Sequence, residues 1–432
     1  MMWTNKTSKI GTTFIIFLLS FSVFGQESLE NKKKDYTLSY PDFIDKLATQ
    51  NLGYAAEQYN ISIAEAEIEA AKIFPDPELS FTAYDNQERR MKMGYGFEAE
   101  LEWDLELGGK RKARKKLALA ERELAEMELI EYFKELRKSA TIEFLKALRN
   151  RMHYDIEKKS YDRMRELSIQ DSIRHKEGKI SKSRANQSKL EVLAKYNHLQ
   201  EVADDCRASL LNIKSLISSY KHDTVYTPTG DLKDFNRVFN LEELIESAKN
   251  NRTDVLITRH QLEISDNKVA LEKAERVMDL GLSIGVENNS FAKNIIGPTP
   301  GHTAVFAGVS VPLQFSNNKD AGLKTAQFEK EQSILRHRQL TLNLEKEITE
   351  AYNDYITKQK QVKLIESSID EAERIFEEEV ENYLKDKTSL LEVLNAERTY
   401  SRIQNQYIHT LLKYAIALVD LESLAGIWDI DF

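Results

Sequence analysis

The sequence predicts a mainly α-helical fold with a β-barrel part, built from two internal repeats. Three observations predict it: the second half of the chain repeats the first, helix-breaking residues are scarce, and stretches of alternating apolar and polar residues separate long helical segments. The chain has 432 residues, of which 16 are Gly, 7 are Pro and 30% are charged. This composition is typical of long helices rather than of a loop-rich enzyme.

The repeat keeps a constant offset over most of its length. An offset of 208 residues (313 − 105) pairs Leu105 with Leu313 and continues to the end of each half. Ahead of the alternating stretches the offset is 201 (244 − 43), which pairs Phe43 with Leu244. The difference between the two offsets must arise in the strand region, where hairpin loops accept insertions at little cost. We therefore expect two similar units, each of which needs neighbours to bury its apolar faces.

The amino terminus has the pattern of a secretory signal. Lys6 and Lys9 precede an apolar run over residues 14–24, and the small residue Gly25 follows. The run is shorter than the roughly 20 apolar residues that span a bilayer. We therefore expect a signal peptide over residues 1–25, cleaved after Gly25, with a permanent anchor as the alternative. No later segment is a candidate membrane helix, so an exported chain would stay in the periplasm or enter a membrane as strands.

In chain order, the first repeat is expected over residues 26–217 and the second over residues 240–425. Residues 218–239 form a linker or equatorial segment, and residues 426–432 form a C-terminal tail. Each repeat is expected to contain a helix, a β-hairpin, a long helix and a further helix. The hairpins are predicted at about 78–105 and 279–313, and the helices at about 40–73, 113–176, 181–217, 241–277, 321–385 and 389–425.

The helices are predicted to stand side by side as staves. Apolar residues recur at steps of three and four, as in Leu117, Ala120, Leu124 and Met127, which indicates helices packed nearly parallel. The two long helices, of roughly 65 residues, would each measure about 100 Å. Two of the shorter helices stacked end to end equal one long helix in length. Helices of equal length packed side by side would form a tube. The alternative, a filamentous coiled coil, leaves the alternating strands unexplained.

The predicted strands have one apolar and one polar face. Residues 94–105 alternate strictly, with Leu101 and Trp103 on the apolar side. The acids on the other side are Glu98, Glu100, Glu102 and Asp104. Such strands suit a transmembrane barrel with a polar lumen, so we expect these acids to face a channel. The alternative is an ordinary sheet that helices cover on one side. Because four strands cannot close a barrel, several chains must contribute.

No group of residues indicates a catalytic, cofactor-binding or metal site. The eight His are scattered without HExxH or close ligand spacing, and Cys206 is the only cysteine. Gly108-Gly109 precedes a helix but lacks the spacing of a phosphate loop, so it indicates a turn. The basic run over residues 110–116 opposes the helix macrodipole, and either lipid phosphate or solvent could offset it. Nucleic acid is not expected to bind an exported chain of net charge −9.

The chain after the signal resembles the TolC-like outer-membrane factor family, also called outer membrane efflux proteins. Three segments carry the resemblance: residues 103–111, with the letters WDLELGGKR, their counterpart 311–319, and the segment from Tyr383 to Glu397. The Gly108-Gly109-Lys110-Arg111 form is similar to a subgroup associated with heavy-metal cation efflux. The resemblance implies a homotrimer with a twelve-stranded transmembrane β-barrel in the outer membrane and a long α-helical barrel, or tunnel, through the periplasm.

The same resemblance implies a passive exit duct rather than an enzyme. The duct would belong to a tripartite efflux system, in which an inner-membrane resistance-nodulation-division transporter and a periplasmic membrane-fusion adaptor deliver metal cations or drugs. It would lie in the bacterial outer membrane, contact outer-membrane lipid and extend into the periplasm. Type I protein secretion is an alternative pathway for such a duct. A periplasmic structural or adaptor protein is an alternative of a different class.

The resemblance also implies a periplasmic gate at the tip of the second helical hairpin. Two pore-facing acids of the family correspond to Glu392 and Asn395, of which only Glu392 is acidic, and Tyr383 matches a tyrosine that holds the tips. This chain has Asp386 and Thr388 where the family often has Gly and a basic residue. The chain therefore departs from the contacts that usually hold the tips together in the family. Glu392 as a solvated residue near a turn is the alternative. The tip residues expected to dock the adaptor are Gly178, Lys179, Ser181, Lys387 and Ser389.

Overall fold

The structure is a computed structural model that describes residues 34–86, 92–219, 224–232, 235–313 and 318–428. The predicted signal peptide and its cleavage site lie outside the described residues, as does the end of the predicted C-terminal tail. In the described part of the chain, every helix is too short or too polar to cross a bilayer.

The two halves of the chain have the same order of elements. The first half contains β1 (Lys34–Leu38), α1 (Tyr40–Gln50), α2 (Leu52–Ala71), β2 (Glu78–Asp85), β3 (Tyr95–Leu105), α3 (Lys110–Lys176) and α4 (Lys182–Leu216). The second contains β4 (Thr224–Pro228), α5 (Leu241–Asn251), α6 (Thr253–Glu275), β5 (Leu280–Asn289), β6 (His302–Ser310), α7 (Asn318–Leu384) and α8 (Leu390–Ala425). Helices α3 and α7 begin 208 residues apart (318 − 110), and α1 and α5 begin 201 apart (241 − 40).

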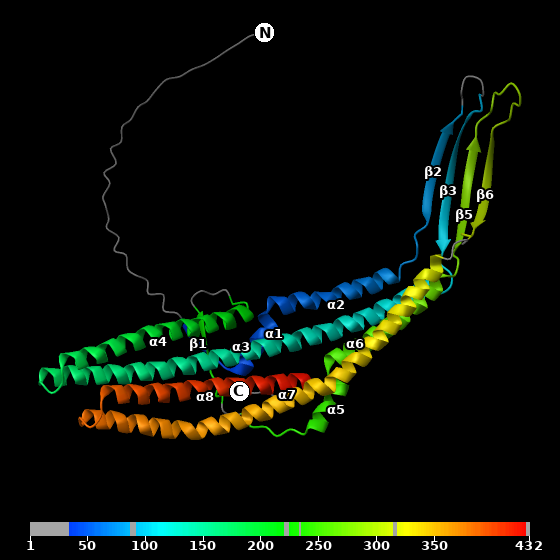
Figure 1. Cartoon of the computed structure of the whole chain (residues 1–432). Helices are drawn as coiled ribbons and strands as arrows, with labels where there is room; N and C mark the ends of the chain where they lie inside the picture. Colours follow the sequence, from blue (N-terminus) through cyan, green and yellow to red (C-terminus); the bar gives the residue numbers. More distant parts are fainter. Residues whose placement is uncertain (1–33, 87–91, 220–223, 233–234, 314–317, 429–432) are drawn as a thin grey trace, which may run out of the picture.

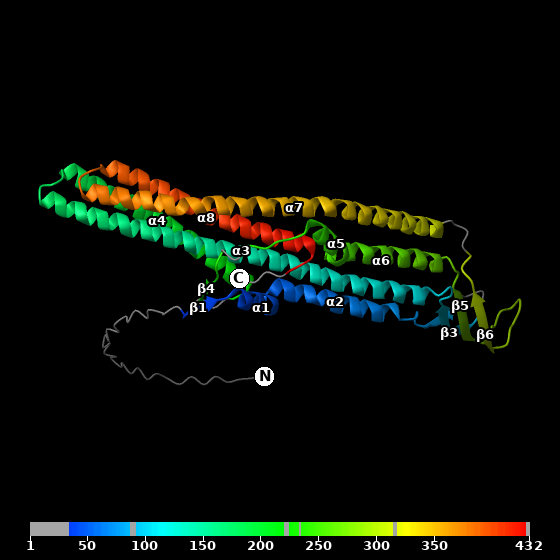
Figure 2. The same ribbon diagram turned by 90° about the horizontal axis from the view of Figure 1, so that it is seen from below.

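The molecule is elongated, with a sheet at one end and two helical hairpin turns at the other (Figure 1). Helices α3 and α7, of 67 residues each, run from the sheet to the turns. Near the sheet the neighbouring helices follow the order α2, α3, α6, α7, and toward the turns the order is α4, α3, α8, α7 (Figure 2). Each half of the helical body is therefore a row of four helices, which agrees with the predicted arrangement as staves.

One predicted helix, over residues 40–73, is two helices in the structure. The chain is extended at Asn51, with φ −69° and ψ 118°, between α1 and α2. The Asn51 side chain accepts a hydrogen bond from the Tyr54 backbone N–H (2.8 Å) and donates to the Leu216 carbonyl (2.8 Å). Because Asn51 caps α2 and also binds the end of α4, the break is a tertiary feature that the apolar periodicity does not reveal.

The predicted helix over residues 241–277 is divided in the same way. Arg252 is extended, with ψ 124°, between α5 and α6. Its buried guanidinium forms ion pairs with Asp254 (2.8 Å) and with Glu347 of α7 (2.8 Å). The break thus lets Arg252 bind two carboxylates from different helices. Arg252 occupies the same position in the second repeat as Asn51 does in the first.

The segment predicted as a linker, over residues 218–239, is packed into the molecule. Its strand β4 pairs in parallel with β1, which brings the start of the first repeat beside its end. Further along, the carbonyl of the buried Phe235 accepts hydrogen bonds from the hydroxyls of Tyr355 (2.9 Å) and Tyr414 (2.8 Å). The segment therefore joins the two repeats through backbone pairing and a shared core.

Two apolar cores hold the helical row together. The larger lies where the two repeats meet and includes Phe43 and Phe144, whose rings stack at 5.3 Å. The smaller lies toward the hairpin turns and contains Met164, Phe376 and Tyr383. Neither core includes a residue of the four-stranded sheet. The sheet therefore projects from a helical body that is stabilised elsewhere.

Candidate functional site

The projecting sheet separates apolar from polar side chains. Its strand order is β2-β3-β5-β6, and all neighbouring strands are antiparallel. Leu101 lies opposite Leu79 on one side and Ile284 on the other. Residues opposite each other share a face, so the register gathers the apolar side chains on one side. The members of this apolar face are Leu79, Phe81, Ala83, Phe97, Ala99, Leu101, Trp103, Leu282, Ile284, Val286, Val305, Ala307 and Val309.

The apolar face has no cover within the described chain. Phe81 is 74% exposed and Val305 is 75% exposed. The sheet stands beyond the ends of the helices, and no described helix packs along it (Figure 1). An ordinary sheet covered by helices, the alternative left open by the sequence, is therefore absent from this part of the chain. A contiguous apolar surface of this kind indicates a lipid or protein partner.

The opposite face carries the four acids that the sequence placed together. Glu98 lies between Thr82 and Glu287, and Glu100 lies between Ser80 and Gly285. Two carboxylates directly opposite each other repel, which is tolerated where water or cations reach them. This acidic face, comprising Glu98, Glu100, Glu102, Asp104 and Glu287, is therefore suited to contact solvent or cations.

Both edges of the sheet are open in the single chain. In the described part of the chain β2 and β6 each pair with one neighbour only. An open edge presents unpaired backbone N–H and C=O groups, which favour pairing with another strand.

The turn between the sheet and α3 needs its two glycines. Gly108 and Gly109 have φ values of +71° and +76°, a region that favours glycine. At Gly108 a Cβ atom would also lie 2.5 Å from the Cβ of Val277. The structure thus agrees with the interpretation of these glycines as a turn.

Protein carboxylates offset two cations of the basic run at the start of α3. The buried Lys110 ammonium lies 2.5 Å from a carboxylate oxygen of Asp279. The Arg114 guanidinium binds both carboxylate oxygens of Glu106, at 2.5 and 2.8 Å. The sequence suggested lipid phosphate or solvent as the partner of this run. For these two residues that suggestion is wrong, because the acids that bind them come from segments the fold brings together.

At the other end of the molecule, Tyr383 joins the two hairpin tips. Its side chain is 1% exposed, and its hydroxyl donates a 2.8 Å hydrogen bond to the buried Asp171 of α3. The Arg174 guanidinium lies 5.1 Å from the Tyr383 ring centre and forms an ion pair with Asp386. Burial, together with the bond to Asp171, raises the pKa of Tyr383. The tyrosine therefore remains a neutral donor, held from both sides.

Asp171 and Arg174 are site residues that the sequence reasoning missed. They lie 212 residues before their partners Tyr383 and Asp386. Neither belongs to a motif that the sequence singled out. Asp386 itself adopts φ +58°, which is uncommon for a non-glycine residue. At the position where the family often has glycine, this chain thus has an acid that binds Arg174.

Glu392 and Asn395 lie together on the exposed side of α8. They line an open groove between α7 and α8, to which Glu371 and Glu379 also contribute. Glu392 also accepts a 2.6 Å hydrogen bond from the Ser389 backbone N–H, which is one half of a capping box. This bond lowers the pKa of Glu392. Tyr383 points elsewhere, toward α3, so the predicted gate residues divide between two places.

The predicted docking residues lie at the turns between the paired helices. Gly178 has φ +74° and open space where a side chain would be, and Ser181 accepts a hydrogen bond from the Arg184 backbone N–H (3.3 Å). Lys179 and Lys387 are exposed, whereas Ser389 is half-buried. These turns form the end of the molecule that is farthest from the sheet (Figure 1).

The fold has close counterparts among solved structures. CusC aligns over 90% of this chain and 92% of its own, with a TM-score of 0.72 and 14% identity. The CmeC outer membrane channel of Campylobacter jejuni aligns over 90% and 85%, with a TM-score of 0.71 and 13% identity. The MtrE outer membrane channel of Neisseria gonorrhoeae, in its open state, aligns over 90% and 89%, with a TM-score of 0.68 and 13% identity. The chain therefore has the fold of these channels.

A protein-family model matches the sequence of the second repeat. Residues 244–427 match the family model described as outer membrane efflux protein. The resemblance predicted from the sequence is thus confirmed. No curated protein sequence matches the chain. The family and the named neighbours are channels rather than enzymes, which is consistent with the expected absence of catalysis.

Proposed function

We propose that the protein is the outer-membrane channel of a tripartite efflux system and acts as a passive exit duct. One observation carries the proposal: an uncovered, amphipathic four-stranded sheet projects from a row of four helices. The apolar face meets lipid because water contact with so many large apolar side chains is unfavourable. The helical row extends from the membrane into the periplasm toward its partners.

The open sheet edges support a homotrimer. Edge-to-edge pairing of three chains turns three four-stranded sheets into one twelve-stranded barrel, and closure removes every free edge. The same symmetry places three rows of four helices around one axis, which forms the tunnel. The trimer thus satisfies the backbone groups and the apolar faces that a single chain leaves open.

The acidic face then lines the barrel lumen, because it lies opposite the lipid-facing side. Three copies of Glu98, Glu100, Glu102 and Asp104 create a negative field that favours cations. This charge supports export of cationic substrates, such as metal cations or cationic drugs. It accords with the heavy-metal subgroup that the Gly108-Gly109-Lys110-Arg111 form resembles.

The hairpin tips act as the periplasmic entrance and docking end. Tyr383, Asp171 and Arg174 hold the two tips of one chain together, and Glu392 from three chains lines the entrance. The turns over residues 178–181 and 387–389, with the exposed Lys179 and Lys387, contact the periplasmic adaptor, which links the duct to an inner-membrane resistance-nodulation-division transporter. Opening of the entrance then requires the tip contacts to move.

Membrane fractionation tests the proposed location. The full chain, expressed with its native amino terminus, is expected to stay in the outer-membrane fraction through a high-salt wash and to leave only with detergent. The matched variant Leu101→Lys places a charge on the apolar face, whereas Ser80→Lys places one on the polar face. Release of the unaltered protein by salt alone, or equal retention of the two variants, would show that the sheet is not inserted in lipid.

A further inference from the structure

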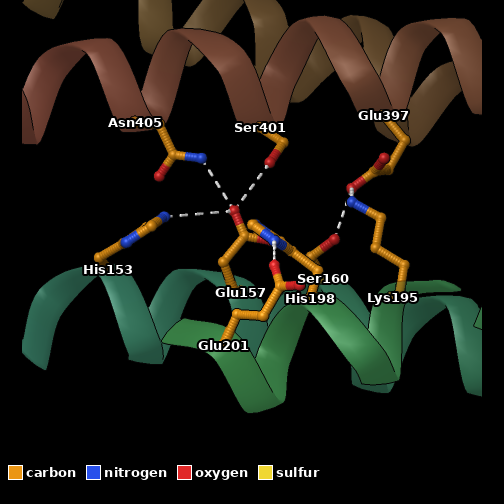
Figure 3. Close-up of polar contacts among 9 residues, drawn as sticks. All are labelled: His153, Glu157, Ser160, Lys195, His198, Glu201, Glu397, Ser401 and Asn405. Atoms are coloured by element: carbon orange, nitrogen blue, oxygen red, sulfur yellow. Dashed lines mark hydrogen bonds and ion pairs between the residues drawn. The ribbon is translucent and has the colours of Figure 1, made fainter. Parts of the chain in front are cut away.

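A cluster of metal-ligating side chains lies in the helical body, away from both the sheet and the tips. His153 and Glu157 are one helical turn apart on α3, and His198 faces them from the neighbouring helix α4 (Figure 3). Their ligating atoms all lie within 4.8 Å of one another. The sequence did not predict this group, because His153 and His198 are 45 residues apart (198 − 153) and lie on different helices.

The donor atoms converge on one carboxylate. The Nε2 atom of His153 lies 3.8 Å from Oε1 of Glu157, and the Nε2 atom of His198 lies 3.9 Å from Oε2. Ligands of a tetrahedral zinc ion are separated by roughly 3.4 Å, since each lies about 2.1 Å from the metal. Small side-chain rotations therefore bring all three donors to metal-binding distance.

Neighbouring residues hold the ligands in the required orientation. Asn405 and Ser401 of α8 donate hydrogen bonds to Oε1 of Glu157, at 2.8 and 3.3 Å. Glu201 lies 3.5 Å from Nδ1 of His198 and accepts a hydrogen bond from it in the tautomer that carries its proton on Nδ1, which leaves the Nε2 lone pair available (Figure 3). Such outer contacts orient the ligands of metal sites and fix the tautomer of a ligating histidine.

The charge of Glu157 also favours a bound cation. Glu157 is 3% exposed, and in the described part of the chain its ion pairs are with the two histidines rather than with lysine or arginine. The nearby Lys195 binds Glu397 instead, at 2.7 Å. A divalent ion supplies positive charge beside this buried carboxylate, which its burial makes favourable.

We propose that His153, Glu157 and His198 form a site for a divalent first-row transition metal ion, such as Zn²⁺ or Cu²⁺. Two imidazole nitrogens and one carboxylate oxygen suit these borderline ions better than Mg²⁺ or Ca²⁺, which prefer oxygen ligands. Water completes the coordination on the side of His198, whose side chain is 49% exposed. The ion links α3 to α4 directly and to α8 through Asn405. This inference is independent of the proposed channel function.

A second group, comprising Glu123, His260 and Glu263, offers a weaker set of ligands. It has one imidazole, and both Glu123 and Glu263 are exposed to solvent. Exposed carboxylates are readily satisfied by water, so this group does not need an ion. It serves below as a test of specificity.

Zinc binding by the purified full chain tests the proposal. The protein is purified in detergent with an affinity tag that contains no histidine, dialysed against a chelator and titrated with Zn²⁺ in competition with a chromophoric chelator. One zinc ion per chain is expected. His198→Ala should weaken the affinity by at least about tenfold, because one of three ligands is lost. His409→Ala, which removes an exposed histidine of α8, should leave it unchanged.

Two results would contradict the proposed metal site. Equal zinc retention by the unaltered protein and by the double variant His153→Ala/His198→Ala would overturn the site. Loss of the bound zinc in His260→Ala, with retention in His198→Ala, would assign it to the second group and also overturn the proposal. Because His198 is half exposed, its removal leaves the fold intact, which circular dichroism of the metal-free variant checks.

Electron paramagnetic resonance of bound Cu²⁺ reports the ligands directly. The unaltered protein should show hyperfine coupling to two imidazole nitrogens, and His198→Ala should show coupling to one. Identical spectra for the two proteins would rule out His198 as a ligand. This measurement does not depend on transport, so a failure of the channel proposal leaves its result interpretable.

Discussion

At the scale of single residues, Tyr383 shows how one side chain can hold two hairpins. Its hydroxyl binds Asp171 of the first hairpin, while Arg174 of that hairpin contacts its ring and also pairs with Asp386 of the second. Loss of the hydroxyl leaves the fully buried Asp171 without its best donor, and such a group costs about 1–3 kcal/mol. The tips are therefore sensitive to a change of one atom.

We expect Tyr383→Phe to increase the leak of the purified channel. The ring and its contact with Arg174 remain, so the change isolates the hydrogen bond to Asp171. Single-channel conductance in planar bilayers, at low voltage, measures the leak. Tyr407→Phe is the control, because that hydroxyl is 3.4 Å from its partner Glu366 and lies outside the tip core. An unchanged conductance in Tyr383→Phe would mean that this bond does not hold the entrance closed.

Glu392 combines two roles that two substitutions can separate. Glu392→Gln keeps a capping side chain and removes the charge, whereas Glu392→Ala removes both. If the carboxylate faces the pore, both variants should weaken block by divalent cations in bilayer recordings. If only Glu392→Ala changes the block by divalent cations, the residue acts as a helix cap.

The lowered pKa of Glu392 determines the pH dependence of that block. A carboxyl group whose pKa is lower in the folded protein contributes stability above its ordinary pKa and loses it as the pH falls through the lower folded value. Cation block should therefore persist on acidification to the ordinary glutamate pKa of about 4.3 and disappear below it. Disappearance near neutral pH would point to a histidine instead.

At the scale of elements, the β3 strand alternates apolar and acidic side chains with a period of two. Glu100 and Leu101 are adjacent in the chain and lie on opposite faces of the sheet. The same substitution at the two positions should therefore have different effects. The difference tests the register rather than the mere presence of a strand.

We expect Glu100→Lys to lower cation selectivity, and Leu101→Lys to impair membrane insertion. On the proposed faces, the first reverses a charge that lines the lumen, and the second places a charge in lipid, which costs about 2–4 kcal/mol near the bilayer centre. Reversal potentials in a salt gradient measure selectivity, and the heat-resistant band on semi-native gels measures insertion. Exchanged phenotypes would mean that the proposed faces are reversed.

At the scale of the whole molecule, the single chain leaves two kinds of surface without a partner. The outer edges of β2 and β6 are unpaired in the described structure, and the apolar face of the sheet is uncovered. The helical body is a row rather than a closed bundle. In the proposed assembly, identical chains pair at these edges and close the row, and lipid covers the apolar face.

We therefore expect the protein to be a trimer in detergent. Native mass spectrometry or light scattering with correction for bound detergent should give three times the mass of the processed chain. A Pro placed at the edge, as in Phe81→Pro, should yield monomers because it removes a backbone donor and disturbs the edge strand. A stable, folded monomer of the unaltered chain would contradict the barrel.

Much of the fold could be predicted because it depends on local periodicity. The period of two over residues 94–105 places Glu100 and Leu101 on opposite faces, and the constant offset of the repeat matches the starts of α3 and α7. The breaks at Asn51 and Arg252 could not be predicted, because each depends on a partner from another helix. The pairing of β1 with β4 was missed because both strands are only five residues long.

The sequence by itself determined the class of the protein: a repeated, mainly helical chain with amphipathic strands and a family resemblance carried by segments in both halves. Only the tertiary structure decided which side chains meet. Asp171 meets Tyr383, and His153 meets His198, because packing sets the relative positions of neighbouring helices. Periodicity reports which face of an element is apolar, since it is a property of adjacent residues. It carries no information about how far one helix is shifted along another, and that shift determines every contact between them.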